Sequence, residues 1–266
     1  MIGLFADIQK LNSPSLRLIF QTVIIFIFIL FNELFLRSIR LNIFDFYLNY
    51  NLVSLLFTSF CLLILINGSN FIDGSNLQCS GYYLAILTIL FHLNFNIVTI
   101  ENIDLVYLLY PFLLSFILYN FLNKSYLGDG GSYLLSFIVG YILINFQITQ
   151  NISPYYVVLF LWYPAFENLF SIIRRIISKK LRPDKPDLLH LHHLIFRYVD
   201  IKYKFNKILK FSMPGIIINF FNLTIFYLGS FFLYSTGKLL ILIFFCIFVY
   251  LTAYFLILKK LKLSND

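Results

Sequence analysis

Eight long apolar segments, separated by shorter polar ones, constrain this chain more than any other feature of its sequence. Helices of roughly 15 to 24 residues fit a hydrocarbon core about 30 Å thick, given tilt and burial against neighbours. Strands of a membrane barrel would instead alternate polar and apolar residues over about ten positions. The sequence therefore predicts an all-α, polytopic integral membrane protein with about eight transmembrane helices. The expected spans are residues 18–34, 52–66, 79–96, 103–122, 133–147, 154–173, 211–234 and 239–258.

The composition agrees with a membrane protein and argues against two soluble domains. Hydrophobic residues make up 60% of the chain and charged residues only 12%, which lies far outside the range of a soluble domain. We therefore expect a single membrane-embedded domain over residues 1–266. The three cysteines show no spacing typical of a disulfide framework or a metal site, so we expect them to be packing residues.

Lysine and arginine are distributed unequally between the polar segments. If the eight spans cross the membrane in turn, only Arg37, Arg40 and Lys238 of the 20 Lys and Arg residues lie on one side. The positive-inside rule then places the other side in the cytoplasm. Because that side holds all the candidate chemistry, we expect a multi-pass protein of the inner (plasma) membrane with a cytoplasmic active face.

The net charge of +8 does not indicate a nucleic-acid partner. Basic residues are concentrated at loop edges beside the spans, and are not interleaved with aromatic residues on a soluble face. Membrane lipid and a phosphorylated substrate are the expected partners. The sequence leaves the oligomeric state open, and a homodimer is compatible with it.

A carboxylate among glycines, in residues 127–132, precedes the apolar run from Tyr133 to Phe146. Three glycines let the main chain approach an anion closely, and the helix that follows presents unpaired N–H groups there. Asp129 could then hold a Mg²⁺ that bridges phosphate oxygens. The alternative is that Asp129 only caps a helix in a Gly-rich turn.

Two further polar groups accompany this loop. Asn67, Asn70 and Asp73 are spaced three apart, so on a helix or tight turn they would lie along one face and aim at one ligand. The alternative is helix capping followed by an Asp-Gly turn. Tyr126 could stack on a base or anchor the membrane interface.

A histidine cluster follows a basic, proline-containing stretch. His190, His192 and His193 lack the i, i+4 spacing of a helical zinc pair, and a contact with diphosphate fits better. Glu167 and Asn168, one turn after Trp162 and Pro164 in the sixth expected span, could orient the basic stretch. The alternative is a solvated loop that merely obeys the positive-inside rule. The basic side chains of the anion-attracting rim would be Arg174, Arg175, Lys179, Lys180 and Arg182.

Taken together, these segments resemble the polyprenyl-phosphate N-acetylhexosamine-1-phosphate transferases, membrane enzymes that begin lipid-linked glycan assembly. Residues 67–74 look like the family's Asn-rich Asp-Gly motif, residues 126–132 like its metal loop, and residues 190–193 like its His-x-His-His motif. Residues 3–7 resemble its Asp-Asp motif. Leu191, between the first two histidines, is similar to the branch that uses simple UDP-amino-sugars, the undecaprenyl-phosphate GlcNAc-1-phosphate transferases.

The resemblance implies a reaction and a role for each motif. A polyprenyl (undecaprenyl) phosphate would attack the β-phosphate of a UDP-N-acetylhexosamine, releasing UMP and starting a lipid-linked cell-envelope glycan. Asp129 would hold Mg²⁺, with Mn²⁺ as the alternative ion, and Asp7 would be a catalytic base or metal neighbour. The histidines His190, His192 and His193 would be catalytic through their contact with diphosphate, and substrate would be bound by Asn67, Asn70, Asp73, Tyr126, Arg174 and Arg175.

The sequence departs from the family pattern near its start. Ala6 replaces the first acidic residue of the Asp-Asp motif, and about three spans that normally precede this motif are absent. The resemblance thus covers nearly all of this chain, but it covers only about the last three quarters of a family member. Removing a charged group that contacts a metal or acts as a base typically lowers the catalytic rate by a factor of about 10² or more. The alternative function is therefore that of a truncated or catalytically impaired paralogue that binds lipid phosphate without turnover.

Overall fold

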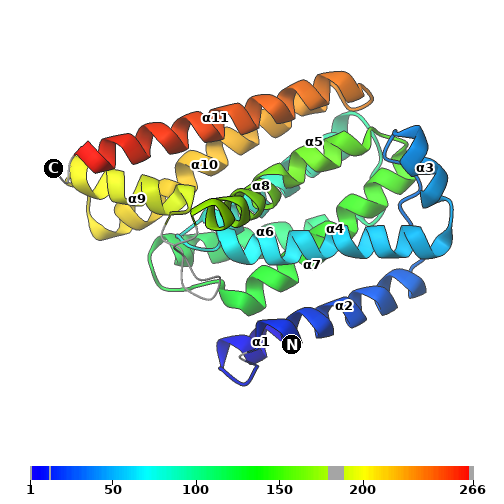
Figure 1. Cartoon of the computed structure of the whole chain (residues 1–266), viewed down its shortest axis with the longest axis horizontal. Helices are drawn as coiled ribbons and strands as arrows, with labels where there is room; N and C mark the ends of the chain where they lie inside the picture. The colour runs from blue at the N-terminus through cyan, green and yellow to red at the C-terminus, as the bar shows by residue number, and fades with distance from the viewer. Residues whose placement is uncertain (1, 12, 179–188, 264–266) are drawn as a thin grey trace.

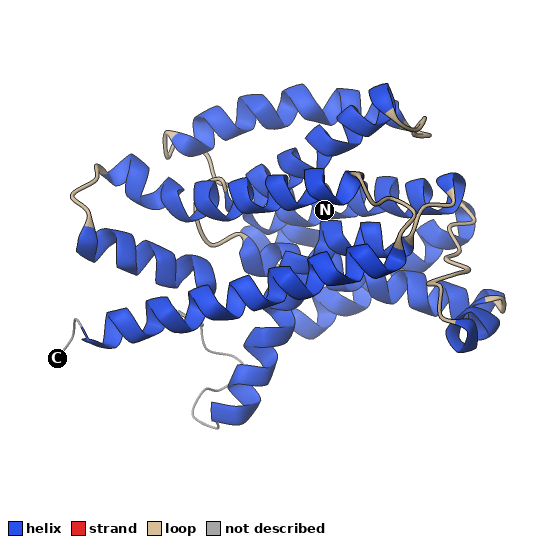
Figure 2. Ribbon diagram, turned by 90° about the horizontal axis from the view of Figure 1, so that it is seen from above, coloured by secondary structure: helices blue, strands red, loops and turns tan. Residues whose placement is uncertain are grey.

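The computed structural model of the chain is a bundle of helices (Figures 1 and 2). It describes residues 2–11, 13–178 and 189–263, and these residues contain no strand, which confirms the predicted all-α class. The helices of the described residues are α1 (Ile2–Asp7), α2 (Pro14–Phe31), α3 (Asn42–Leu48), α4 (Asn51–Ile72), α5 (Gln78–Asn96), α6 (Ile103–Phe121), α7 (Gly128–Gln150), α8 (Pro154–Ser178), α9 (Leu191–Lys202), α10 (Lys207–Ser230) and α11 (Thr236–Leu263).

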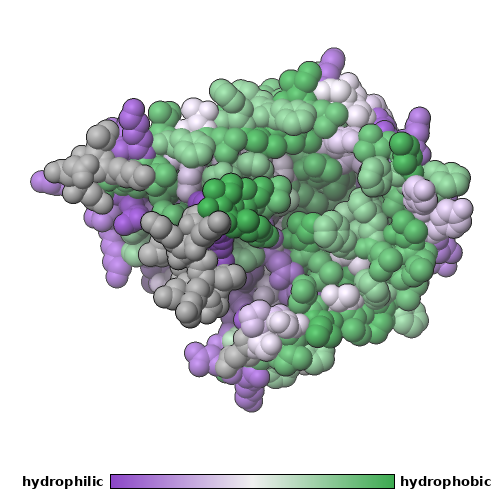
Figure 3. Space-filling view, viewed as in Figure 1, coloured by the Kyte–Doolittle hydropathy of each residue, from purple (hydrophilic) through white to green (hydrophobic). Residues whose placement is uncertain are grey.

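Seven of the described helices are long and apolar enough to cross a membrane, and this confirms a polytopic membrane protein. They are α2, α4, α6, α7, α8, α10 and α11. The remaining predicted span, residues 79–96, forms the helix α5, which is not among these seven. Helix α5 packs against α10 and α6, and the polar residues Gln78 and Ser80 at its start are buried. Large apolar side chains such as Phe31 and Phe220 are exposed, as is expected where helices face lipid. Hydrophobic residues cover much of the face shown in Figure 3.

The first polar motif is helical and not a separate polar segment. The predicted span ended at residue 66, whereas α4 continues to Ile72 and ends at Asp73. Asn67 donates to the Leu63 carbonyl at 2.8 Å and Ser69 to the Leu65 carbonyl at 2.6 Å. Because these side chains bond back to their own helix, the polar residues do not end it.

Helix α9 was not predicted, because the sequence between the expected spans 154–173 and 211–234 was interpreted as a polar connection. Its buried residues Leu191, Leu194, Ile195 and Val199 recur every three to four positions, so one apolar stripe packs against α10 and α11. The histidine motif therefore begins a helix that rests on the bundle.

The packing of these helices brings the predicted motifs to one end of the bundle. In Figure 1, α1 and α9 lie at the same end and α3 at the opposite end. The start of α7 contacts α1, and α4 packs between α7, α8 and α2. Segments more than 100 residues apart in sequence can therefore share one site.

Candidate functional site

The glycine-rich motif is the first turn of α7, not a loop before a helix that starts near residue 133. Gly128 has a φ of +65°, in the left-handed region that favours glycine. A Cβ at Gly128 would also lie only 3.1 Å from the carboxylate oxygens of Asp7. The glycine is thus required both by its backbone conformation and by the close approach of Asp7.

The Asp7 carboxylate accepts hydrogen bonds from the backbone amides at the start of α7. The N–H of Asp129 donates to Oδ1 of Asp7, and the N–H of Gly130 donates to Oδ2, both at 2.9 Å. The sequence predicted that these amides would receive a phosphate, because helix N-termini attract anions. In this structure the anion that they hold is the chain's own carboxylate. A Cβ at Gly3 would lie 2.5 Å from the Asp129 carbonyl oxygen, so α1 rests directly on α7.

The Asp129 side chain is held on both of its oxygens. Nη1 of Arg17 donates to Oδ2 at 2.7 Å, and Nδ2 of Asn70 donates to Oδ1 at 2.6 Å. The sequence analysis did not assign Arg17 to the site, since a basic residue before the first span is also what the positive-inside rule expects. No local pattern links residues 17 and 129, so only the folded chain shows the ion pair.

The three side chains predicted to share one face have different neighbours. Asn70 reaches Asp129, whereas Asn67, one turn deeper, donates to Oε1 of Gln21 on α2 at 3.2 Å. Asp73 ends α4, where burial raises the pKa of its carboxyl to about 7. The nearby charges of Asp129 and Asp7 raise this pKa further, and a hydrogen bond from the Gly128 amide opposes them. Asp7, Asp73 and Asp129 thus form one acidic group, called the carboxylate half below.

The carboxylate half fits a Mg²⁺ that is completed by substrate. No group of three acidic, histidine or cysteine side chains in the described part of the chain forms a full metal cage. Mg²⁺ is usually bound by one or two carboxylates together with waters and substrate phosphates, so a full cage is not needed. Burial beside two other acids also disfavours an ionised Asp73 unless a cation is near. Asp129, with Asp73 beside it, would hold the ion.

The histidine motif is held by a buried carboxylate. Nδ1 of His190 lies 2.8 Å from Oε1 of Glu167, which also accepts from the Leu191 amide at 3.3 Å. The hydroxyl of Tyr250 donates to the other oxygen of Glu167 at 2.7 Å. Glu167, on α8, is fully buried. Its contacts with His190 and Leu191 agree with the prediction that it orients the segment after α8. Such a contact fixes the ring orientation and places the proton on Nδ1.

The three imidazoles lie together beside the end of α4. The rings of His190 and His192 stack with centroids 5.6 Å apart, and those of His192 and His193 are 4.3 Å apart. A Cβ on Gly74 would collide with Nε2 of His192. His192 is 1% exposed, neither ring nitrogen has a hydrogen-bond partner among the described residues, and burial lowers its pKa well below the usual value. His190, His192 and His193 with Glu167 are called the histidine half below.

The remaining predicted residues take different positions around these two halves. Nη1 of Arg174 donates to the Leu189 carbonyl at 2.7 Å and to the Tyr254 hydroxyl at 3.1 Å, so it secures the entry to the histidine motif. Arg175 is partly exposed beside it, and Tyr126 is 75% exposed. Lys179, Lys180 and Arg182 of the predicted basic rim lie outside the described residues.

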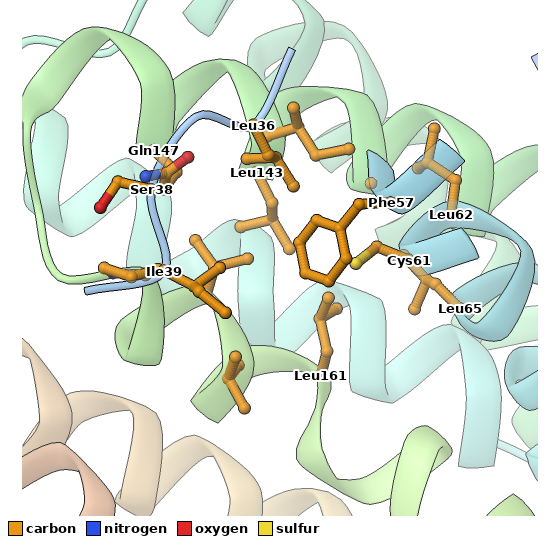
Figure 4. Close-up of a pocket in the computed structure, with 15 residues that line it drawn as sticks. Leu36, Ser38, Ile39, Phe57, Cys61, Leu62, Leu65, Leu143, Gln147 and Leu161 are labelled. Carbon is orange, nitrogen blue, oxygen red and sulfur yellow. The ribbon is translucent and has the colours of Figure 1, made fainter. Parts of the chain in front are cut away.

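An apolar pocket lies between α4, α7 and α8 (Figure 4). Its lining includes Phe57, Cys61, Leu143 and Leu161, and Ser38 and Gln147 lie at one edge. The residues from α7 are at least twelve positions beyond Gly128, and the lining also includes Leu36 and Ile39 before α3, so the pocket lies away from the candidate site. Its lining suits hydrocarbon, and it contains none of the charged groups of the site.

Comparison with known proteins gives the family of this arrangement. The model of the family described as glycosyl transferase family 4 matches residues 1–147, more than half of the chain. Undecaprenyl-phosphate alpha-N-acetylglucosaminyl 1-phosphate transferases are similar over a shorter stretch. That of Thermotoga maritima is 36% identical over 76 residues, which are 29% of this chain and 25% of the relative. Those of Yersinia pestis and Escherichia coli K12 are 39% and 38% identical over 77 and 78 residues, 28% of this chain and 20% of each relative. The matched region thus spans a quarter or less of these curated relatives, and no solved structure matches the chain.

Proposed function

This chain belongs to glycosyl transferase family 4, and from that premise we propose that it transfers N-acetylhexosamine-1-phosphate from a UDP-sugar to polyprenyl phosphate. The names of the similar proteins support undecaprenyl phosphate as the acceptor and N-acetylglucosamine as the sugar. One observation carries the proposal most strongly. Asp7, Asn70 and Asp129, from three separate motifs, meet in direct hydrogen bonds at the start of α7.

The proposed reaction breaks one phosphoanhydride bond and forms another. An oxygen of polyprenyl phosphate attacks the β-phosphorus of the UDP-sugar, and the bond to the α-phosphate breaks, so UMP leaves with the electron pair. Mg²⁺, when bound at Asp129, supplies charge neutralisation on the phosphates. Asp7, held by the α7 amides, lies beside Asp129 and would accept the proton of an acceptor phosphate that is still protonated.

The histidine half would contact the diphosphate from the other side. The Glu167 carboxylate accepts from Nδ1 of His190 and so fixes the orientation of its ring. His193 lies beside His192 in the same cluster. Arg174 and Arg175 add positive charge at the end of α8, and the exposed ring of Tyr126 is free to stack on the uracil base.

The acceptor lipid agrees with the position of the site. A polyprenyl chain would lie in the hydrocarbon region while its phosphate reaches the end of the bundle that holds α1 and α9 (Figure 1). The distribution of basic residues supports the cytoplasmic face of the plasma membrane for this end. UDP-sugars are also cytoplasmic metabolites, so donor and acceptor would meet there.

A non-catalytic, lipid-phosphate-binding relative is the second candidate, and Ala6 is the observation that favours it. Ala6 removes a carboxylate from the start of the chain. The neighbouring Asp7 still makes two hydrogen bonds to α7, so the carboxylate half is assembled without an acid at position 6.

A double-label transfer assay separates these functions. Purified protein in nanodiscs receives undecaprenyl phosphate, Mg²⁺ and UDP-N-acetylglucosamine that carries ³H in the sugar and ³²P in the β-phosphate. Sugar-1-phosphate transfer moves both labels into the organic phase in equal amounts, whereas simple sugar transfer moves only ³H. Other UDP-amino-sugars are tested in the same way, and Asp129→Asn is the matched control. Absence of both labels from the lipid for every donor, with folded protein, contradicts the proposal and favours the non-catalytic relative.

A further inference from the structure

The ion pair of Arg17 with Asp129 places a cation on the carboxylate that the proposed function gives to a metal. We propose that Arg17 balances the charge of Asp129 while no metal is bound, and that it yields Oδ2 to the metal on binding. The proposal rests on the proposed function, because it requires a divalent cation at Asp129.

The first argument is charge. The carboxylate half gathers three acids, and among the ion pairs of the described residues the one made by these acids is Arg17 with Asp129. Asp7 is balanced by two backbone amides and Asp73 by the amide of Gly128, and neither contact supplies a full positive charge. Arg17 therefore lowers the repulsion within the half before any ion arrives.

The second argument is that the ion pair between Arg17 and Asp129 is weak enough for a metal ion to displace Arg17. The side chains of Arg17 and Asp129 are 23% and 27% exposed, and they meet through one contact from Nη1 rather than the two parallel contacts of a bidentate pair. Partly exposed pairs of this kind contribute little, about 1 kcal/mol or less. A divalent ion bound by the same carboxylate and by phosphate can displace such a partner.

The third argument concerns the other oxygen of Asp129. Asn70 donates to Oδ1 from the last turn of α4 and carries no charge, so it orients the carboxylate without competing electrostatically with a metal. The two partners thus have separate effects, orientation by Asn70 and charge balance by Arg17. Once released, the Arg17 guanidinium has five donors and lies close enough to interact with phosphate at the same site.

Mn²⁺ binding to nanodisc-embedded protein, measured by electron paramagnetic resonance without substrate, tests this proposal. Removing the competing cation in Arg17→Gln should lower the Kd for Mn²⁺ by roughly three- to fivefold, the factor that such an ion pair contributes. Arg17→Lys keeps a positive charge, so its Kd should stay near that of the wild type. The matched control Arg197→Gln changes an exposed residue of α9 and should leave the Kd unchanged.

A purely structural role for Arg17 predicts the opposite sign, because a disordered Asp129 would bind Mn²⁺ more weakly. An unchanged or raised Kd in Arg17→Gln, with Mn²⁺ bound by the wild type and lost in Asp129→Asn, overturns this inference alone. If the wild type and Asp129→Asn bind Mn²⁺ equally weakly, both this inference and the metal site of the proposed function are wrong. If Arg17→Gln does not fold, a Kd for Arg17→Lys that is more than threefold above the wild-type value also overturns the inference.

Discussion

The carboxylate half and the histidine half of the site are held in place by opposite means. Asp129 is about a quarter exposed and is held by two side chains from other helices, of which one is a displaceable cation. Glu167 is fully buried and is held by a tyrosine, a histidine and a backbone amide. One half is therefore suited to exchange its partners, and the other is fixed before any ligand binds.

This difference follows from where each half lies in the chain. The carboxylate half is assembled from the ends of α1, α4 and α7, whose polar groups meet near the bundle surface. The histidine half depends on a residue within the span α8, where an unpaired carboxylate would be costly and every oxygen needs a partner. The physical setting thus separates ligand exchange from fixed orientation, and the following changes test that separation.

The largest expected effect is on transfer in Asp129→Asn. The amide keeps the size of the side chain and a hydrogen bond to Asn70 or Arg17, but it loses the charge that would bind the metal. Transfer should fall by a factor of about 10² or more, with a small change in thermal midpoint. The rate of label transfer and the melting curve are measured together, with Asp104→Asn at the exposed start of α6 as the control. A large loss of stability in Asp129→Asn would show that the carboxylate half is not exchangeable but structural.

Glu167→Gln should affect both activity and stability. The amide has one acceptor oxygen in place of two, and its NH₂ group would face the donor from Tyr250 or those from His190 and Leu191. Transfer should fall by about 10- to 100-fold, the usual cost of losing the partner that orients a functional histidine, and the thermal midpoint should fall as well. Tyr250→Phe removes one hydrogen bond and should give a smaller loss of both. Wild-type stability with Glu167→Gln would contradict a fixed histidine half.

The junction between the halves is tested by Gly74→Ala. The added methyl group would collide with His192, which is buried and cannot move without disturbing its neighbours. Overpacking of this kind costs about 1 to 3 kcal/mol, so the thermal midpoint should fall and transfer with it. Gly237→Ala is the matched control, because a Cβ there has no neighbour within 4 Å. Equal midpoints for the two variants would mean that the halves do not touch as described.

The smallest expected effect is the pH dependence contributed by Asp73. Its pKa is raised to about 7 by burial and by the nearby acids, so the folded state binds its proton more tightly than the unfolded state. In metal-free protein this carboxyl therefore costs stability above about pH 7, and the cost disappears as the pH falls towards 4. Asp73→Asn should raise the thermal midpoint at pH 8, with a smaller gain at pH 5. An equal gain at both pH values, or none, contradicts this assignment.

The sequence predicted the positions of the helices more accurately than the contacts between them. The eight predicted apolar segments are all helical, because hydrocarbon leaves the backbone few other ways to satisfy its polar groups. Two predicted boundaries were wrong, because glycine and asparagine were interpreted as breaks in helices. Helix α7 starts at Gly128 and not near residue 133, and α4 ends at Ile72 and not at residue 66. Helix α9 was missed because its short apolar stripe lies within a charged stretch.

The sequence predicted which residues belong to the site, but not which residues they contact. Spacing within each motif gave Asp129, Asn70 and the histidines, because each motif is local. The ion pair of Arg17 joins residues 112 positions apart, and no single-sequence pattern carries such a pairing. Glu167 was expected to orient the basic stretch that follows, but no pattern in the sequence shows that His190, Leu191 and Tyr250 are its partners.

The most direct test of the division between the halves is Mn²⁺ binding compared in Asp129→Asn and Glu167→Gln. Electron paramagnetic resonance of each nanodisc-embedded protein gives the Kd for Mn²⁺ in the presence of UMP. The account predicts that Asp129→Asn loses Mn²⁺ binding, while folded Glu167→Gln retains a Kd within about threefold of the wild type even though its transfer activity is low. Equal loss of Mn²⁺ in both variants, or retention in Asp129→Asn, would contradict the assignment of the metal to the carboxylate half.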